Sequence, residues 1–171
     1  MRNQTNDFTM KKLKGAIIGC GFFAENHILA WKELKYIEII AVCDLNKKKA
    51  MNFKNQYKIP YFYQSIQTML KNHKLDFVDV VTTMETHLDI SRILTKFKIP
   101  TSIQKPFAPN INNAKTIVKL YKKANTPLMV HENFRWQTPL IKLKKIIKKY
   151  NLYNPIYSKI SFRHSNPVGI Y

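Results

Sequence analysis

The chain alternates between short apolar runs and longer segments in which apolar residues recur every three or four positions. Short apolar runs are typical of buried strands, and the second spacing gives a helix one apolar face. Strands are predicted over residues 14–18, 37–43, 60–63, 77–81, 100–103 and 128–130. Helices are predicted over residues 23–35, 46–56, 65–72, 90–97, 110–121 and 139–150. The links between these segments are short, so each helix returns the chain directly to the next strand.

This order of elements predicts the fold class. Strands that alternate with helices form right-handed crossovers and a parallel sheet with helices on both faces. We therefore expect an α/β protein with a doubly wound sheet in the order 3-2-1-4-5-6. In such a sheet, ligands bind at the carboxyl ends of the strands, where the strand order reverses.

The link after the first predicted strand carries a recognisable pattern. In the run LKGAIIGCGFFA, Gly19, Gly21 and Ala24 form G-x-G-x-x-A. The first glycine allows a tight turn, the second lets a pyrophosphate approach the backbone, and the small third residue lets the helix pack close to the strand. The N-terminus of the following helix then faces the phosphates. The pattern predicts a dinucleotide-binding turn.

A carboxylate is expected about 20 residues after such a turn, where it holds the adenosine ribose hydroxyls. Asp44 ends the second predicted strand and has this position. It could also cap the helix that starts near Asn46, and both roles are compatible. A carboxylate here favours NAD, whereas the lysines at 47–49 could soften the preference and leave NADP open.

The two ends of the chain differ from the middle. Residues 1–12 are polar without periodicity and are predicted to be a loose tail before a domain over 13–150. Residues 156–162 alternate like a half-exposed antiparallel strand, for which the sequence offers no partner. We expect residues 151–171 to begin a truncated second α+β domain of a larger protein.

The net charge of +19 raises the alternative of nucleic-acid binding. The charge comes almost entirely from lysine, with arginine only at four positions, and base-reading proteins favour arginine. The lysines are spread over predicted helix surfaces, as in residues 142–149, where apolar residues form the other face. Solvated helix faces explain the charge better, and no specific nucleic-acid partner is expected.

The remaining composition is that of a globular protein, with 45% apolar and 23% charged residues among 171. Cys20 and Cys43 form no C-x-x-C pair, so no disulfide framework and no metal site are predicted. No apolar run is long enough for a membrane span. A lipoprotein signal ending at Cys20 is excluded because only residues 15–19 separate it from the last lysine, fewer than a signal needs. A cytoplasmic location is expected.

Polar and titratable residues follow three predicted strands, in the segments 82–87 (TTMETH), 104–107 (QKPF) and 131–136 (HENFRW). Together with the glycine turn, Asp44 and Pro139, these ordered motifs resemble the N-terminal half of the Gfo/Idh/MocA family of NAD(P)-dependent oxidoreductases. The first two segments correspond to the T-P-x-x-x-H and E-K-P motifs of the family, and Asn133 to Arg135 matches its N-x-R motif. The resemblance covers residues 15–162.

The resemblance implies roles for individual residues. Thr82 and His87 would lie near the middle of the cofactor, and Lys105 would stand beside the nicotinamide and the substrate hydroxyl, where a lysine can relay a proton. Lys105 is therefore the catalytic candidate, although a solvent-facing lysine is the plain alternative. The implied cofactor-binding residues are Gly19, Gly21, Phe22, Phe23, Ala24, Asp44, Thr82, Thr83, His87, Gln104, Lys105, Asn133 and Arg135.

The sequence departs from the family in several places. Gln104 replaces the usual glutamate and loses a charge that could pair with Lys105, and Thr83 replaces a common proline. The Asp and His that complete proton transfer in the family would lie beyond Tyr171. His27 is expected to be a packing histidine and His131 a hydrogen-bonding residue at a strand end. His164 has no assigned role.

The expected function is hydride transfer between a nicotinamide and a carbinol of a sugar, inositol or related polyol. The alternative is a non-catalytic dinucleotide-binding or interaction module, a truncated remnant of such an enzyme. The family usually forms homo-oligomers through its second domain, which leaves the oligomeric state of this chain open.

Overall fold

The computed structural model of this chain describes residues 12–154, 156–159 and 161. The chain divides into two compact units, residues 1–132 and 133–171, and each is described by itself. The predicted tail lies outside the described residues except for Lys12.

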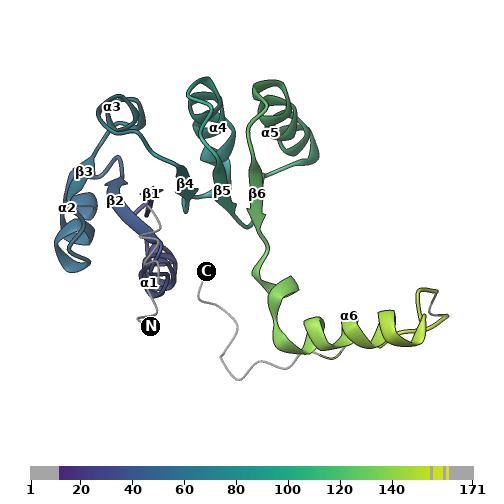
Figure 1. Cartoon of the computed structure of the whole chain (residues 1–171). Coiled ribbons are helices and arrows are strands. Elements are labelled where there is room, and N and C mark those ends of the chain that lie inside the picture. The colour runs from purple at the N-terminus through teal and green to yellow at the C-terminus, as the bar shows by residue number, and fades with distance from the viewer. Residues whose placement is uncertain (1–11, 155, 160, 162–171) are drawn as a thin grey trace, which may run out of the picture. The chain divides into compact units, whose positions relative to one another are not determined.

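The first unit contains one parallel sheet of six strands in the order β3-β2-β1-β4-β5-β6 (Figure 1). The strands are β1 (Leu13–Ile18), β2 (Ile37–Cys43), β3 (Tyr61–Tyr63), β4 (Phe77–Val80), β5 (Thr101–Gln104) and β6 (Leu128–His131). This order confirms the doubly wound α/β fold predicted from the alternation of strands and helices. The strand order reverses between β1 and β4, and the glycine turn follows β1 at this point of the sheet.

Five helices connect these strands. They are α1 (Ala24–Glu33), α2 (Lys47–Gln56), α3 (Ile66–Asn72), α4 (His87–Lys96) and α5 (Ile111–Ala124), and a short 3₁₀ turn (Met84–Thr86) precedes α4. The predicted N-cap of α5 is confirmed, because the Asn110 side chain accepts a hydrogen bond from the backbone N–H of Asn113. Asn46 and Ser65 cap α2 and α3 in the same way.

The helices cover both faces of the sheet, and the alternation of side chains along each strand builds one core on each face. Ile18 and Val80 point into the core that α3, α4 and α5 share. Ile17 and Val42 point into the core on the other face, with α1 and α2. Figure 1 shows α3, α4 and α5 in a row on one side of the sheet and α1 on the other.

The second unit contains a 3₁₀ turn (Asn133–Trp136) followed by α6 (Thr138–Tyr150). A strand is predicted over residues 156–162, where the described residues 156–159 and 161 have irregular structure and Ile160 and Phe162 lie outside the described residues. A strand is stabilised by hydrogen bonds to a partner strand. The described residues of the second unit include no other strand that could supply them.

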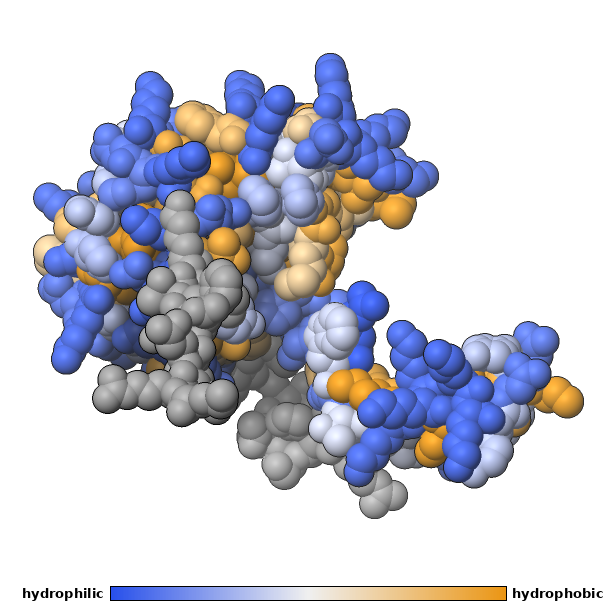
Figure 2. All heavy atoms as spheres, in the orientation of Figure 1, coloured by the Kyte–Doolittle hydropathy of each residue, from blue (hydrophilic) through white to orange (hydrophobic). Residues whose placement is uncertain are grey.

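The many lysines are found mainly on helix surfaces. The lysines of α6, at positions 142, 144, 145, 148 and 149, are all exposed. Figure 2 shows hydrophilic side chains projecting outward with hydrophobic patches between them. Within the described parts of the chain, no helix combines the length and the apolar character required to cross a membrane.

Candidate functional site

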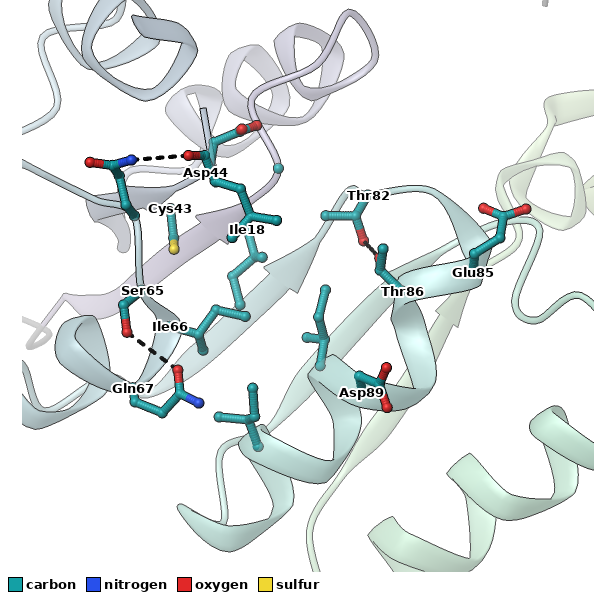
Figure 3. Close-up of a pocket in the computed structure, with 15 residues that line it drawn as sticks. Ile18, Cys43, Asp44, Ser65, Ile66, Gln67, Thr82, Glu85, Thr86 and Asp89 are labelled. Carbon is teal, nitrogen blue, oxygen red and sulfur yellow. Dashed lines mark hydrogen bonds between the residues drawn. The ribbon is translucent and has the colours of Figure 1, made fainter. Parts of the chain in front are cut away.

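The carboxyl ends of β1, β2 and β4 border a cavity of about 620 Å³ (Figure 3). Its apolar floor includes Ile18 from β1 and Ile66 from α3, and polar groups such as Asp44 and Thr82 stand at its rim. A cavity of this volume suits a ligand of nucleotide size. The cavity lies at the carboxyl ends of the strands, the sheet edge where ligand binding is predicted.

The glycine turn after β1 forms one wall of the cavity. Gly19 has φ of 97°, and a Cβ added to it would lie 2.5 Å from the carbonyl oxygen of Val81. Its backbone N–H donates to the carbonyl of Cys43 at 2.8 Å. A side chain at this position would therefore strain the backbone and press on β4, so only glycine fits.

Gly21 has a different environment. No heavy atom lies within 4 Å of a Cβ added here, so the backbone of Gly21 faces open space. Helix α1 begins three residues later at Ala24, which is fully buried against the core below. Gly21, Phe22 and Phe23 are exposed, while the N–H of Ala24 donates to the Gly21 carbonyl at 3.0 Å. An exposed turn before a helix N-terminus fits the phosphates of a dinucleotide.

Asp44 connects the glycine turn to the end of β2. Its Oδ2 accepts the backbone N–H of Cys20 and its Oδ1 accepts that of Asn46, each at 2.8 Å. The structure assigns the cap of α2 to Asn46, whose side chain accepts from the N–H of Lys49, and not to Asp44. Asp44 is only partly buried and lines the cavity, and each carboxylate oxygen can accept more than one hydrogen bond. It can therefore also accept ribose hydroxyls.

The two cysteines lie beside this carboxylate and are both buried. Burial, and secondarily the charge of Asp44, raises the pKa of Cys20 and of Cys43 to about 12. Both side chains are therefore neutral thiols at physiological pH, which makes them poor nucleophiles and poor metal ligands.

The cavity has an acidic lining although the chain is strongly basic. Asp44, Glu85 and Asp89 all line it, and the described residues around it include no lysine or arginine. Lys47 to Lys49 are exposed but are not part of the lining. This lining would repel the additional phosphate of NADP, so it supports the expected preference for NAD.

The residues of the polar segment after β4 differ in whether they line the cavity. The hydroxyl oxygens of Thr82 and Thr86 lie 2.8 Å apart, and both threonines line the cavity (Figure 3). Thr83 is exposed beside them, and its carbonyl accepts the same Thr86 hydroxyl at 2.8 Å. Thr82 and Thr83 thus remain within reach of a ligand.

The imidazole of His87 lies inside the protein, and its contact with a cofactor stays a prediction. Its side chain is completely buried. Its Nδ1 lies 3.0 Å from the carbonyl oxygen of Phe107, and its Nε2 lies 3.1 Å from that of Thr82. Because both ring nitrogens are used within the protein, His87 ties the loop after β5 to the end of β4 and supports the site from below.

Lys105 follows β5 and lies beside the glycine turn. Its ammonium nitrogen is 5.9 Å from the centre of the Phe23 ring, a cation–π contact. The peptide bond between Lys105 and Pro106 is cis. Phe22, in contrast, has 88% of its surface exposed and is free to contact a ligand. The structure thus brings the catalytic candidate and the phosphate turn together.

Gln104 does not lie in the cavity as a cofactor contact would. Its side chain is buried, its Oε1 accepts the backbone N–H of Lys105 at 2.7 Å, and its Nε2 lies 2.8 Å from the Nε2 of His27. The amide therefore positions Lys105 through the backbone. A direct contact between Gln104 and the cofactor stays a prediction.

His27 is a buried, hydrogen-bonded histidine, as expected. Its Nδ1 lies 2.7 Å from Oδ2 of Asp79, and its ring packs edge-on against that of His131 at a centroid distance of 4.7 Å. His131 was expected to form hydrogen bonds, but the contact seen for its ring is this packing. Burial, with His27 as the next cause, lowers the pKa of His131 from its ordinary value.

Asp79 is a buried carboxylate to which the sequence pattern assigned no role. It is fully buried in the middle of β4, where its Oδ2 also accepts the indole N–H of Trp31 at 2.7 Å. A carboxylate in a strand buried on both faces needs hydrogen-bond donors. His27 and Trp31, four positions apart on one face of α1, are those donors and were the available signal.

Ligand-type atoms of His27, Asp79 and His131 lie within 4.8 Å of one another. Both ring nitrogens of His27 already have partners in Asp79 and Gln104. Hydrogen bonding therefore accounts for this cluster without a metal ion.

Asn133 and Arg135 belong to the second unit, so their part in the site remains a prediction. Both residues are exposed, and the Arg135 guanidinium lies 4.9 Å from the centre of the Trp136 ring.

Comparison with known proteins gives relatives with the same architecture. The chain is 40% identical over 154 residues to a D-apiose dehydrogenase of Rhizobium rhizogenes, covering 90% of this chain and 45% of that protein. An oxidoreductase from Agrobacterium radiobacter, solved with NAD+, L-tartaric acid and magnesium, superimposes with a TM-score of 0.78 at 40% identity. That match covers 81% of this chain and 41% of the other.

A second solved relative is the WlbA dehydrogenase from Chromobacterium violaceum, in complex with NADH and UDP-GlcNAcA. It superimposes with a TM-score of 0.77 at 26% identity, covering 82% of this chain and 41% of that one. The chain thus spans less than half the length of these relatives.

The sequence profile of the Gfo/Idh/MocA oxidoreductases, described as an oxidoreductase family with an NAD-binding Rossmann fold, matches residues 13–132. The matched segment holds all six strands, the glycine turn, Asp44 and Lys105. The chain therefore belongs to the Gfo/Idh/MocA family of oxidoreductases and contains its NAD-binding Rossmann domain.

Proposed function

We propose that this chain is the cofactor-binding part of an NAD-dependent dehydrogenase that oxidises a carbinol of a sugar or related polyol. The observation that carries the proposal is the position of Lys105 beside the glycine turn, with its ammonium over the ring of Phe23. A proton-transfer group and a phosphate-binding turn at one sheet edge are the parts that such a reaction needs. The naming of the Rhizobium relative as a D-apiose dehydrogenase supports a sugar as the substrate class.

The chemistry assigned to this chain is limited to binding and proton transfer. A bound nicotinamide would supply the acceptor for the hydride that leaves the carbinol carbon. Lys105 takes the hydroxyl proton as the carbon becomes a carbonyl. Gly19, Gly21 and Asp44 hold the dinucleotide at the edge of the sheet.

The first test is cofactor binding to the 171-residue chain. Isothermal titration with NADH and NADPH is expected to give clear binding of NADH and weaker binding of NADPH, because the lining of the cavity is acidic. Binding to the folded state should also raise the melting temperature. Absence of binding for both dinucleotides would overturn the proposal.

The second test is turnover with NAD and D-apiose, followed by NADH formation, for the chain and for Lys105→Ala. Turnover that depends on Lys105 supports the dehydrogenase. Weak or no turnover is expected of a chain that spans less than half the length of its relatives. The alternative, a non-catalytic dinucleotide-binding module, predicts NADH binding without turnover of D-apiose or of a panel of polyols even for a full-length protein.

A further inference from the structure

A row of buried hydrogen bonds runs from the centre of the sheet to the catalytic candidate. It starts at Oδ2 of Asp79 in β4, passes through both nitrogens of His27 in α1, and continues through the Gln104 amide to the backbone N–H of Lys105. The three distances between neighbouring heavy atoms are 2.7, 2.8 and 2.7 Å. The side chains of the first three residues are each at least nine-tenths buried.

The direction of every hydrogen bond in this row follows from its last member. The backbone N–H of Lys105 can only donate, so the Gln104 atom that faces it must be the amide oxygen. The amide NH2 then faces His27 and donates to its Nε2. An imidazole with an acceptor at Nε2 carries its proton on Nδ1, and that proton is donated to Asp79. Every hydrogen bond in the row is therefore donated in the same direction, from Lys105 toward Asp79.

The surroundings hold this row in place. The Phe23 ring packs edge-on against His27 at 5.8 Å and also lies under the ammonium of Lys105. The His131 ring packs against His27 from β6. Two donors, Trp31 and His27, fix the Asp79 oxygen, while its other oxygen, Oδ1, has no hydrogen-bond partner among the described residues.

We propose that Asp79, His27 and Gln104 act as one positioning unit that holds the backbone of Lys105, and through it the ammonium, at the edge of the dinucleotide site. The amide of Gln104 keeps His27 in the neutral form with its proton on Nδ1. A glutamate at 104 would instead accept from Nε2 and require a proton there. Within this unit only Asp79 carries a charge. The unit therefore acts by holding Lys105 in place. The assignment rests on the proposed role of Lys105.

The protonation of His27 can be measured directly. In the ¹⁵N-labelled 171-residue chain, long-range ¹H–¹⁵N correlation of the imidazoles is expected to show His27 as neutral with the proton on Nδ1. His27→Gln identifies the signals by their loss. An imidazolium, or a proton on Nε2, at neutral pH would overturn the proposal.

The hold on Lys105 is read from hydrogen exchange of its backbone amide. Gln104→Met removes the acceptor at similar volume and is expected to speed this exchange by about tenfold or more, the loss of one hydrogen bond. His27→Leu should speed it through Gln104, whereas His27→Gln can still accept at one end and donate at the other and should restore slow exchange. Unchanged exchange in Gln104→Met would contradict the assignment.

Trp31→Phe is the matched control. It removes a donor from the same oxygen of Asp79 but lies outside the row to Lys105, so exchange of the Lys105 amide should not change. Equal acceleration in Trp31→Phe would mean that loosening of the core, and not the row, controls Lys105. If His27→Leu does not fold, the NMR assignment and Gln104→Met still decide the question.

The same variants separate this inference from the proposed function. In Gln104→Met, any turnover that depends on Lys105 should fall through kcat and not through KM. If the chain binds neither NADH nor NADPH, the proposed function fails, but the His27 signals and the Lys105 exchange rate still test the positioning unit.

Discussion

The two glycines of the phosphate turn should respond to the same substitution in opposite ways. Gly19 has φ of 97°, and an added Cβ would lie 2.5 Å from the carbonyl oxygen of Val81 and 2.9 Å from Cγ2 of Thr82. Gly21 is not in the left-handed region, and an added Cβ there meets no heavy atom within 4 Å. Gly19→Ala therefore tests folding, and Gly21→Ala tests the use of the open space above the turn.

The expected loss for Gly19→Ala follows from these two effects. A residue with a side chain in this backbone region costs about 1–3 kcal/mol, and overlap with a neighbouring backbone costs about 1–3 kcal/mol more. A total near 3 kcal/mol would lower the melting temperature of a chain of this size by roughly 6–12 °C. Gly21→Ala should leave the melting temperature unchanged or slightly higher, because alanine restricts the unfolded chain.

NADH binding should show the reverse order, with the larger loss in Gly21→Ala. A methyl group at Gly21 would occupy the space where the backbone approaches the pyrophosphate, and an overlap of about 1–3 kcal/mol weakens NADH binding by roughly ten- to a hundredfold. Urea unfolding gives the stability of each variant, and isothermal titration gives the affinity. Wild-type NADH affinity in Gly21→Ala, or wild-type stability in Gly19→Ala, would refute the reasoning from these positions.

Three further predictions address the rest of the site. Lys105→Ala should lower turnover by about a hundredfold or more with little change in NADH affinity, which steady-state kinetics and titration separate; equal turnover would remove Lys105 from the reaction. Asp44→Ala should weaken NADH binding more than NADPH binding, because it removes both a ribose acceptor and a repulsive charge; parallel losses in titration would contradict this. The raised pKa of Cys20 and Cys43 makes stability fall as pH rises from the unfolded-state value of 9.0 toward about 12, because the unfolded chain then holds fewer protons than the folded one. Urea unfolding across this range should show a smaller fall in Cys43→Ala, and an equal fall would assign the effect to other groups.

The fold could be predicted from the sequence because its signals are local and repeated. Each strand of the first unit is a short apolar run, and its neighbours carry a helical spacing with caps such as Asn110. The glycine turn identifies the strand before it as the one at which the strand order reverses. No such repetition supports a strand over residues 156–162, where alternation alone was the argument and the described residues are irregular.

The site was harder to predict because position along a strand end does not tell where a side chain points. His87 and Gln104 stand in the expected motifs, but both are buried and hydrogen-bonded to the protein itself. The network around Asp79 joins α1, β4 and β5 through three long-range hydrogen bonds, whose partners are 48, 52 and 77 positions apart in the sequence. Such pairings depend on the packing of helix against sheet, which local patterns do not contain.

Asp44 limits how the cofactor preference of this chain can be redesigned. The same carboxylate that faces the cavity also accepts the N–H of Cys20 within the phosphate turn. An exchange for alanine to admit NADP would leave that N–H without its acceptor and loosen the turn that both cofactors need. A successful redesign would keep a short acceptor at 44, such as serine or asparagine, and would place the new positive charge elsewhere, with the exposed Lys47 to Lys49 segment as the nearest source.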